Sequence, residues 1–380
     1  MNPKADPGLA LHEGLYVPSP LSTSAQIATR LELEPASTHL MIGATGSGKS
    51  TELFAIRGRL GKVGDVTALF QDVAAVQQLA QLKEGSLVGL AWRLIWADVT
   101  QRYQSIASGF SDATFATNIA NGFWNDEEWP DDGDRFDWVP GLITPPQRNE
   151  DLERLIGYLK TLLSQVPTQY VLLLDGLDRM RDVAKLTSVL LYDLFTLVEL
   201  GVGSVVVGPP ELRGDAYREF NERFATFHFH GATDPNNDDA QTFLNRVLEL
   251  RAVGELLPAS SRNALVGWSG GILRDLIALA KNAGDNAYGS AHQAISESDV
   301  NDAADRFGRS LLVGISDSAA TRLTSLSGFG ITRYFAFTVA SADDLDLLLR
   351  RLVIEVMEVP PKFFIHPTVR PLLRGLRKAV

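Results

Sequence analysis

The stretch HLMIGATGSGKSTEL, which runs from His39 to Leu53, decides the fold class of this chain. It contains the pattern G-x-x-x-x-G-K-[ST], with a short apolar run before it and a helix-like run, Ser50 to Gly61, after it. A strand, a glycine-rich loop and a helix in this order are the context in which the pattern binds phosphates. Glycines let the backbone fold tightly around an anion, and the loop amides and the helix N-terminus attract negative charge. The stretch therefore predicts a nucleoside triphosphate site.

Each position of this loop has an expected role. Lys49 is expected to reach the β- and γ-phosphates and to act in catalysis, and the Ser50 hydroxyl is expected to bind Mg²⁺. The predicted cofactors are therefore ATP and Mg²⁺. The predicted phosphate-binding residues are consecutive in the chain: Gly43, Ala44, Thr45, Gly46, Ser47, Gly48, Lys49, Ser50 and Thr51.

Composition narrows the class of protein. The chain has 380 residues, a net charge of −11 and no cysteine. Its length predicts two or three domains, and its acidity argues against bulk electrostatic binding of DNA. Disulfides and cysteine-based zinc sites are excluded. We find no apolar run long enough to span a membrane and no basic-then-apolar signal at the N-terminus, so we expect a cytoplasmic protein without a membrane partner.

Strands and helices alternate through the first two thirds of the chain. We expect strands at 39–43, 65–73, 170–180, 203–212 and 225–231, and helices at 50–61, 86–103, 151–166 and 184–200. Such alternation is typical of a parallel sheet covered by helices on both faces. The predicted fold class is therefore α/β, with a three-layer αβα P-loop domain at 37–235 and an N-terminal extension at 1–36.

Residues 104–150 interrupt this alternation. The segment contains GFWNDEEWPDDGDRFDWVPGLITPP, in which Trp124, Trp129 and Trp138 lie among seven acidic residues. We interpret it as an insertion loop. Its tryptophans either form a docking surface for a partner or pack back onto the core.

The pattern changes twice more towards the C-terminus. Residues 236–315 are expected to form a helical lid, with Ser296, Ser298 and Asp299 as N-cap material before its last helix. Residues 316–380 combine helices with a strand–turn–strand pattern in VIEVMEVPPKFFIHP, which predicts a winged-helix-like domain closed by a basic helix at 369–380.

The segment VLLLDGLDRM supplies acidic groups for nucleotide chemistry. Asp175 follows a buried strand, and ligands bind at the carboxyl ends of strands in such sheets. We expect Asp175 to support Mg²⁺ as the Walker B residue, and Asp178 to orient the attacking water. The alternative for both is a role in the turn, since Asp-Gly-Leu-Asp is also good turn composition. Gly176 stands where an adjacent catalytic glutamate would be.

These motifs resemble those of the AAA+ and STAND-type P-loop ATPases, over roughly residues 35–310. LLLDGLDR is similar to the Walker B segment of the STAND and KAP groups, although Arg179 stands where many STAND proteins have another acid. The resemblance implies a five-stranded parallel sheet in the order 5-1-4-3-2. The order of P-loop domain, lid and winged helix also resembles the origin-recognition ATPases. Similar compact bacterial ATPases are associated with anti-phage defence.

The resemblance implies roles for further residues. Arg223, before the last strand, matches the arginine that reaches into a neighbouring subunit's site, and Arg274 matches the lid arginine that contacts the bound phosphates. Both are also ordinary surface positions for an arginine. The polar residue at the end of the fourth strand is absent, or Glu211 or Arg213 replaces it.

Three functions remain. The first is an ATP-hydrolysing switch or assembly regulator for a protein partner, an effector or a regulator, with a homo-oligomer in the ATP state. The second is a DNA-dependent AAA+ ATPase that acts through its winged helix and Arg370, Arg374, Arg377 and Lys378. Net charge favours the first. The third, a small-molecule kinase, lacks an arginine cluster for a substrate phosphate.

Overall fold

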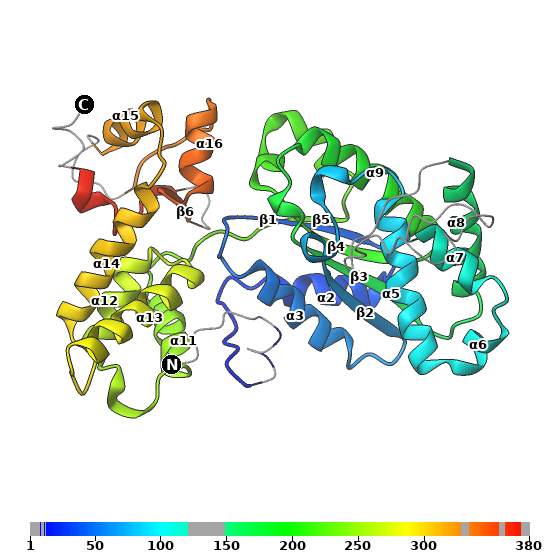
Figure 1. The fold of residues 1–380 in the computed structure, drawn as a ribbon, viewed down its shortest axis with the longest axis horizontal. Coiled ribbons are helices and arrows are strands. Elements are labelled where there is room, and N and C mark those ends of the chain that lie inside the picture. Colours follow the sequence, from blue (N-terminus) through cyan, green and yellow to red (C-terminus); the bar gives the residue numbers. More distant parts are fainter. Residues whose placement is uncertain are drawn as a thin grey trace, which may run out of the picture. The chain divides into compact units, whose positions relative to one another are not determined.

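The computed structural model describes residues 8, 11, 13–120, 149–327, 334–356 and 362–373, and these form two compact units. One unit comprises Thr23–Ile42 and Leu53–His228 and contains a parallel sheet (Figure 1). The other comprises Met1–Ser22, Gly43–Glu52 and Phe229–Val380. The glycine-rich loop therefore belongs to the same compact unit as the C-terminal helices. The domain boundaries expected at 36, 235 and 315 remain a prediction.

The sheet has five strands in the order β2-β3-β4-β1-β5, which confirms the expected order 5-1-4-3-2. β1, β3 and β4 lie in its centre and pair in parallel, with Ile42 opposite Gly208 and Leu174 opposite Val206. Every residue of β1 and β4 is buried, as expected for strands covered on both faces. The strands are β1 (Thr38–Ile42), β2 (Val66–Asp72), β3 (Gln169–Asp175), β4 (Gly203–Gly208) and β5 (Thr226–Phe229).

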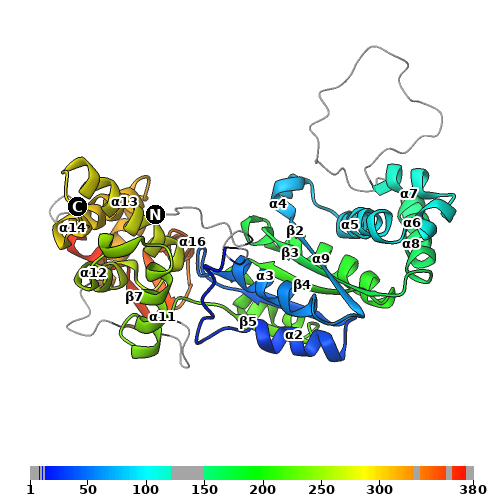
Figure 2. The same ribbon diagram turned by 90° about the horizontal axis from the view of Figure 1, so that it is seen from below.

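Helices cover both faces of the sheet (Figure 2). On one face, Ile27 of α2 and Ile56 of α3 share a hydrophobic core with Met41, Leu173 and Val205. On the other face, α9 packs against β4, and α5 packs beside α9. The helices of this part of the chain are α2 (Ser24–Leu33), α3 (Lys49–Leu60), α4 (Val73–Val76), α5 (Ser86–Arg102), α6 (Gln104–Gly109), α7 (Ala113–Ala120), α8 (Asn149–Leu163), α9 (Val183–Glu199) and α10 (Arg218–Asn221).

One expectation for an irregular segment is corrected, and two others lie largely outside the described residues. The first part of the predicted insertion loop forms the short helices α6 and α7, because Trp92 and Trp96 of α5 provide an aromatic surface against which Phe110, between these helices, packs. Residues 121–148, which include the three tryptophans of the predicted docking segment, lie outside the described residues. At the C-terminus, the expected basic helix begins as a short 3₁₀ turn, Arg370–Leu372, and residues 374–380 lie outside the described part.

The lid consists of four helices around one core. These are α11 (Asp238–Glu249), α12 (Ala259–Ser269), α13 (Leu273–Gly289) and α14 (Glu297–Leu312). Leu244, Leu265, Leu279 and Val300 contribute one fully buried side chain from each helix. α14 begins with a capping box in which the Ser296 hydroxyl accepts from the backbone of Asp299 while the Asp299 carboxylate accepts from the backbone of Ser296, which confirms the expected N-cap.

The C-terminal module pairs two helices with an antiparallel hairpin. It contains α15 (Asp317–Leu326), α16 (Ala342–Leu349), β6 (Val353–Val356) and β7 (Lys362–Ile365). The lid and the module are joined by a buried ionic contact, in which the Arg351 Nε lies 3.0 Å from Asp275 Oδ2 and the His366 Nε2 lies 3.4 Å from it. They also approach closely at Gly308 of α14, where a Cβ would lie 2.2 Å from the Thr368 carbonyl oxygen. The expected combination of helices and hairpin is therefore present.

Candidate nucleotide-binding site

The predicted site residues fall into two groups, one in each compact unit. The glycine-rich loop, from Gly43 to Lys49, and Arg274 belong to the unit that contains the lid. Asp175, Asp178 and Arg223 belong to the sheet unit.

The glycine-rich loop has the backbone that the sequence predicts. Gly43, Gly46 and Gly48 have φ angles of +154°, +87° and +113°, which side-chain-bearing residues rarely adopt. α3 begins at Lys49, so the first amides of this helix, which lack acceptors within the helix, follow the loop directly and favour an anion there. Ser47 is buried, and its hydroxyl has no hydrogen-bond partner among the described residues. A loop of this shape with an unpaired buried hydroxyl fits a phosphate group.

Lys49 is held over the loop that it is expected to serve. Its side chain is 5% exposed, and its Nζ donates to the carbonyl oxygens of Gly43 and Ala44 at 2.9 and 3.0 Å. One turn later, Glu52 is also buried and accepts a hydrogen bond from the Ser22 hydroxyl at 2.6 Å. The ammonium group is thus positioned at the mouth of the loop, where it is able to exchange these carbonyl contacts for phosphate oxygens.

The lid meets the loop directly. The backbone N–H of Arg274, in the first turn of α13, donates to the Gly46 carbonyl oxygen at 3.1 Å. A Cβ on Gly46 would lie 2.7 Å from the Cβ of Arg274, so this contact also requires glycine. The structure therefore places the backbone of Arg274 against the phosphate loop, and contact of its side chain with bound phosphates remains a prediction.

His230 was not identified from the sequence. It follows β5, is 4% exposed, and its Nε2 lies 3.2 Å from the Ser47 carbonyl oxygen. Burial lowers the pKa of His230; Glu52 nearby opposes this effect and Lys49 adds to it. No local pattern in the sequence points to this contact, because it joins residues 183 positions apart.

The acidic group lies at the carboxyl edge of the sheet. Asp175 ends β3 and is 7% exposed, and its Oδ1 accepts from the Gly176 N–H at 2.8 Å. Gly176 has a φ of +81°, and a Cβ there would lie 2.2 Å from Asp72 Oδ1. A glutamate next to Asp175 would therefore clash with Asp72. Asp72 also lies 3.6 Å from the Arg179 guanidinium, so this arginine pairs with an acid of the neighbouring strand.

Asp178 lies in a short 3₁₀ turn, Leu177–Arg179, directly after Asp175 and Gly176. Asp178 interacts electrostatically with Glu211, which follows β4 in the 3₁₀ turn Pro210–Arg213. Burial raises the pKa of Glu211, and Asp178 raises it further. The Glu211 Oε2 has no hydrogen-bond partner within the described ranges. Two acidic side chains, from the ends of β3 and β4, therefore lie near each other at this edge.

Comparison with known proteins finds similarity in fold but not in sequence. No protein-family model matches the chain, and no curated protein matches it. Among solved structures, the Aeropyrum pernix ORC2 protein in its ADPNP–ADP complexes is 14% identical, with a TM-score of 0.50 over 96% of this chain and 95% of that one. The chain therefore has a fold like that of the ORC2 protein. The A. pernix ORC1 protein in complex with DNA (13% identical, TM-score 0.46, 98% and 97% covered) and Cdc6p from Pyrobaculum aerophilum (13%, 0.45, 96% and 95%) are less similar.

Arg223 occupies an exposed position in the sheet unit. It follows α10 and precedes β5, which is an edge strand of the sheet. Phe220 and Phe224 on either side of it pack edge to face, with ring centroids 5.1 Å apart, and hold this turn in place. The guanidinium is therefore accessible to a second molecule, and its role across an interface stays a prediction.

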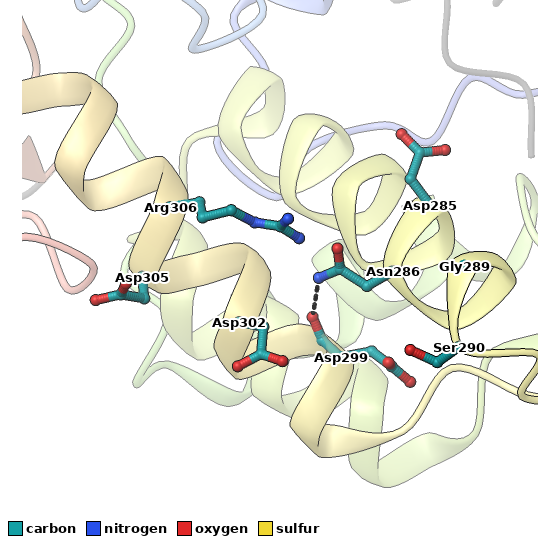
Figure 3. Close-up of a pocket in the computed structure, with 8 residues that line it drawn as sticks. All are labelled: Asp285, Asn286, Gly289, Ser290, Asp299, Asp302, Asp305 and Arg306. Carbon is teal, nitrogen blue, oxygen red and sulfur yellow. Dashed lines mark hydrogen bonds between the residues drawn. The ribbon is translucent and has the colours of Figure 1, made fainter.

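The lid also contains a surface pocket away from the phosphate loop. It has a volume of about 550 Å³ and lies between α13 and α14 (Figure 3). Its wall includes four carboxylates and one arginine: Asp285, Asp299, Asp302, Asp305 and Arg306. Such a lining repels a triphosphate, so this pocket is not a second nucleotide site.

Proposed function

We propose that this chain binds ATP and Mg²⁺ and hydrolyses ATP slowly, as an AAA+ ATPase whose nucleotide state controls its lid and thereby a protein partner. The observation that carries the proposal is the contact of the phosphate loop with the lid inside one compact unit. Arg274 of α13 donates its backbone N–H to Gly46, and Gly46 has no space for a side chain. An anion in this loop changes the surroundings of the first turn of the lid helix.

Each residue of the site has a separate role in binding or hydrolysis. Lys49 exchanges the carbonyl oxygens of Gly43 and Ala44 for phosphate oxygens, and the loop amides donate to the same phosphates. Ser50 and Asp175 are the residues that would hold Mg²⁺, which would supply positive charge beside the phosphates. Asp178 orients the attacking water. The AAA+ fold shared with the ORC2 protein, whose structure contains ADPNP and ADP, supports this assignment.

The proposed switch needs little energy. A closed lid that binds the nucleotide a few kcal/mol more tightly than an open lid is enough to change which state is populated. The Asp275–Arg351–His366 contact then carries a movement of α13 to the hairpin of the C-terminal module, since Asp275 is the neighbour of Arg274 in the same helical turn. STAND-type control and a role in anti-phage defence remain predictions from the resemblance.

The decisive test compares nucleotide binding by Lys49→Ala with binding by a matched control variant, Lys62→Ala. Lys62 is exposed and lies just after the end of α3, the helix that Lys49 begins. Loss of a charge-assisted contact costs about 1.5–3 kcal/mol, so Lys49→Ala should bind a fluorescent ATP analogue roughly ten- to hundredfold more weakly. Lys62→Ala should bind as the parent does. Equal affinity of Lys49→Ala and the parent would remove the assignment.

A DNA-dependent AAA+ ATPase is the alternative, and the hairpin module with the exposed Arg370 favours it. The other basic residues on which this alternative draws, Arg374, Arg377 and Lys378, lie outside the described residues. A gel-shift titration at several salt concentrations separates the two functions, because phosphate contacts make DNA affinity fall steeply with salt. Binding that persists at 0.15 M salt and stimulates ATP turnover would favour the DNA function.

A further inference from the structure

His230 is a buried, ionisable side chain in contact with the phosphate loop that the proposed function does not use. Its Nε2 lies 3.2 Å from the Ser47 carbonyl oxygen, and its Nδ1 is buried without a hydrogen-bond partner among the described residues. A carbonyl oxygen only accepts, so this contact requires the proton on Nε2. The contact therefore specifies one tautomer of the ring.

The acceptor of this bond belongs to a peptide group with a second role. The Ser47 carbonyl and the Gly48 N–H are parts of one planar trans peptide, so they point in opposite directions. When His230 holds the carbonyl oxygen on its own side, the Gly48 N–H is directed away from the histidine. In a phosphate loop of this kind, inward-pointing amides form the anion site.

This peptide needs to be held. Gly48 has a φ of +113°, and glycine changes between positive and negative φ at little cost. Rotation of the 47–48 peptide would exchange the N–H for the carbonyl oxygen, which carries a partial negative charge and repels phosphate. A side chain that fixes this carbonyl therefore protects the affinity of the loop for anions.

Packing keeps the histidine in place. A Cβ on Gly43 would lie 1.9 Å from the His230 carbonyl oxygen, and one on Gly48 would lie 3.5 Å from the ring Nε2 and 3.1 Å from Leu273 Cδ1. The backbone of His230 therefore packs against Gly43, and its ring packs against Gly48. Burial lowers the pKa of the ring, which keeps it neutral beside Lys49.

We propose that His230 is a positioning residue of the nucleotide site, which donates from Nε2 to the Ser47 carbonyl and so keeps the Gly48 N–H available to the phosphates. The proposal rests on the proposed function, because it assumes that the loop binds nucleotide. It adds a residue that connects the end of the sheet's last strand to phosphate affinity. His230 acts through the loop and does not itself contact the nucleotide.

Two substitutions separate hydrogen bonding from shape. His230→Phe keeps a ring without a donor, whereas His230→Gln keeps an amide that is able to donate to Ser47. His228→Phe, two residues earlier and half-buried, is the matched control. Titration with a fluorescent ADP analogue should show roughly tenfold weaker binding by His230→Phe, and binding within about threefold of the parent by His230→Gln and His228→Phe.

A second measurement does not depend on the folding of a variant. The ¹⁵N chemical shifts of the His230 ring in the parent protein should identify a neutral ring that is protonated on Nε2. A ring protonated on Nδ1, or a His230→Phe chain that folds and binds the ADP analogue like the parent, would overturn the proposal. Equal weakening in His230→Gln and His230→Phe would also overturn it. If the parent protein binds nucleotide no better than Lys49→Ala does, the proposed function is refuted, and this inference with it.

Discussion

At the scale of single residues, acidic side chains at the sheet edge allow the metal and water roles to be tested separately. Asp178→Asn should keep nucleotide affinity and slow turnover, by roughly ten- to a hundredfold, because an amide orients water less well than a carboxylate. Asp175→Asn should instead weaken the dependence of binding on Mg²⁺. Steady-state turnover and binding titrations with and without Mg²⁺ measure both effects.

Asp182→Asn is the control for these variants. Asp182 caps α9 through the Lys185 N–H at 2.9 Å, and asparagine caps a helix about as well as aspartate. If Asp178→Asn turns over ATP at the rate of this control, Asp178 is a turn residue, and Glu211 is then the acidic side chain to test next.

His39 makes the stability of the sheet depend on pH. Its ring is fully buried in β1 and bonded to the hydroxyls of Ser37 and Thr226, and burial, with smaller contributions from His228 and Arg30, lowers its pKa from 6.5 to about 4. The unfolded chain therefore binds this proton between pH 6.5 and 4 while the folded chain does not. Stability from His39 is complete above pH 6.5 and is lost as pH falls towards 4.

The measurement is the difference in unfolding free energy between the parent and His39→Gln. That difference should shrink between pH 7 and pH 4 by roughly 3 kcal/mol, at about 1.4 kcal/mol per pKa unit. The comparison is needed because burial raises the pKa of Asp193 to about 7, and the contribution of Asp193 changes with pH in the opposite direction. A difference that does not change with pH would show that His39 is protonated in the folded chain or accessible to water.

At the scale of secondary-structure elements, one aspartate joins two helices. Asp193 of α9 is fully buried, and its carboxylate accepts from the backbone N–H groups of Gly85 and Leu87 at 2.6 Å each. These amides belong to the start of α5, which has no side-chain cap of its own. Asp193 therefore caps a neighbouring helix from the middle of another.

Asp193→Ala should leave two buried amides without an acceptor, at a cost of roughly 2–4 kcal/mol in the free energy of unfolding. Asp182→Ala, which removes an exposed cap at the start of the same α9, should cost only about 1 kcal/mol. Denaturant titration of the two variants compares them directly. Similar losses for both would mean that the α5 amides find other acceptors.

At the scale of the whole molecule, the described helices lack the length and apolar character needed to cross a bilayer.

Self-assembly of the chain is the property to test at this scale. The exposed Arg223 at an edge of the sheet predicts that one chain completes the site of another. An arginine supplied in trans is worth 10³–10⁵ in rate in the best-studied GTPases, so a large effect is expected.

Turnover per chain should therefore rise with protein concentration, and light scattering after size-exclusion chromatography should show a larger species with ATP and Mg²⁺ than without. A mixture of Arg223→Ala and Lys49→Ala chains should recover some activity, because one junction in the mixed assembly again holds both groups. Strictly linear turnover and an inactive mixture would mean that the chain works as a monomer, with Arg274 as its own arginine.

The sequence by itself determined the features that depend on neighbouring residues. The glycine pattern before Lys49, the buried run that ends at Asp175 and the N-cap residues around Ser296 all lie within a few residues, and propensity and spacing predict them. The strand order came from resemblance, and the sheet confirms it. The local pattern failed at α6 and α7, where helices form because α5 offers a surface for Phe110.

Only the tertiary structure decided which distant residues meet. His230 lies against Ser47, Arg274 against Gly46, Asp193 at the start of α5, and Arg351 beside Asp275. No spacing rule connects these pairs. Packing of the lid on the loop, and of the C-terminal module on the lid, brings them together, and close backbone approach at glycines such as Gly46 and Gly308 makes that packing possible. The phosphate loop is thus a local property of the sequence, whereas the residues that hold it and respond to it are selected by the fold.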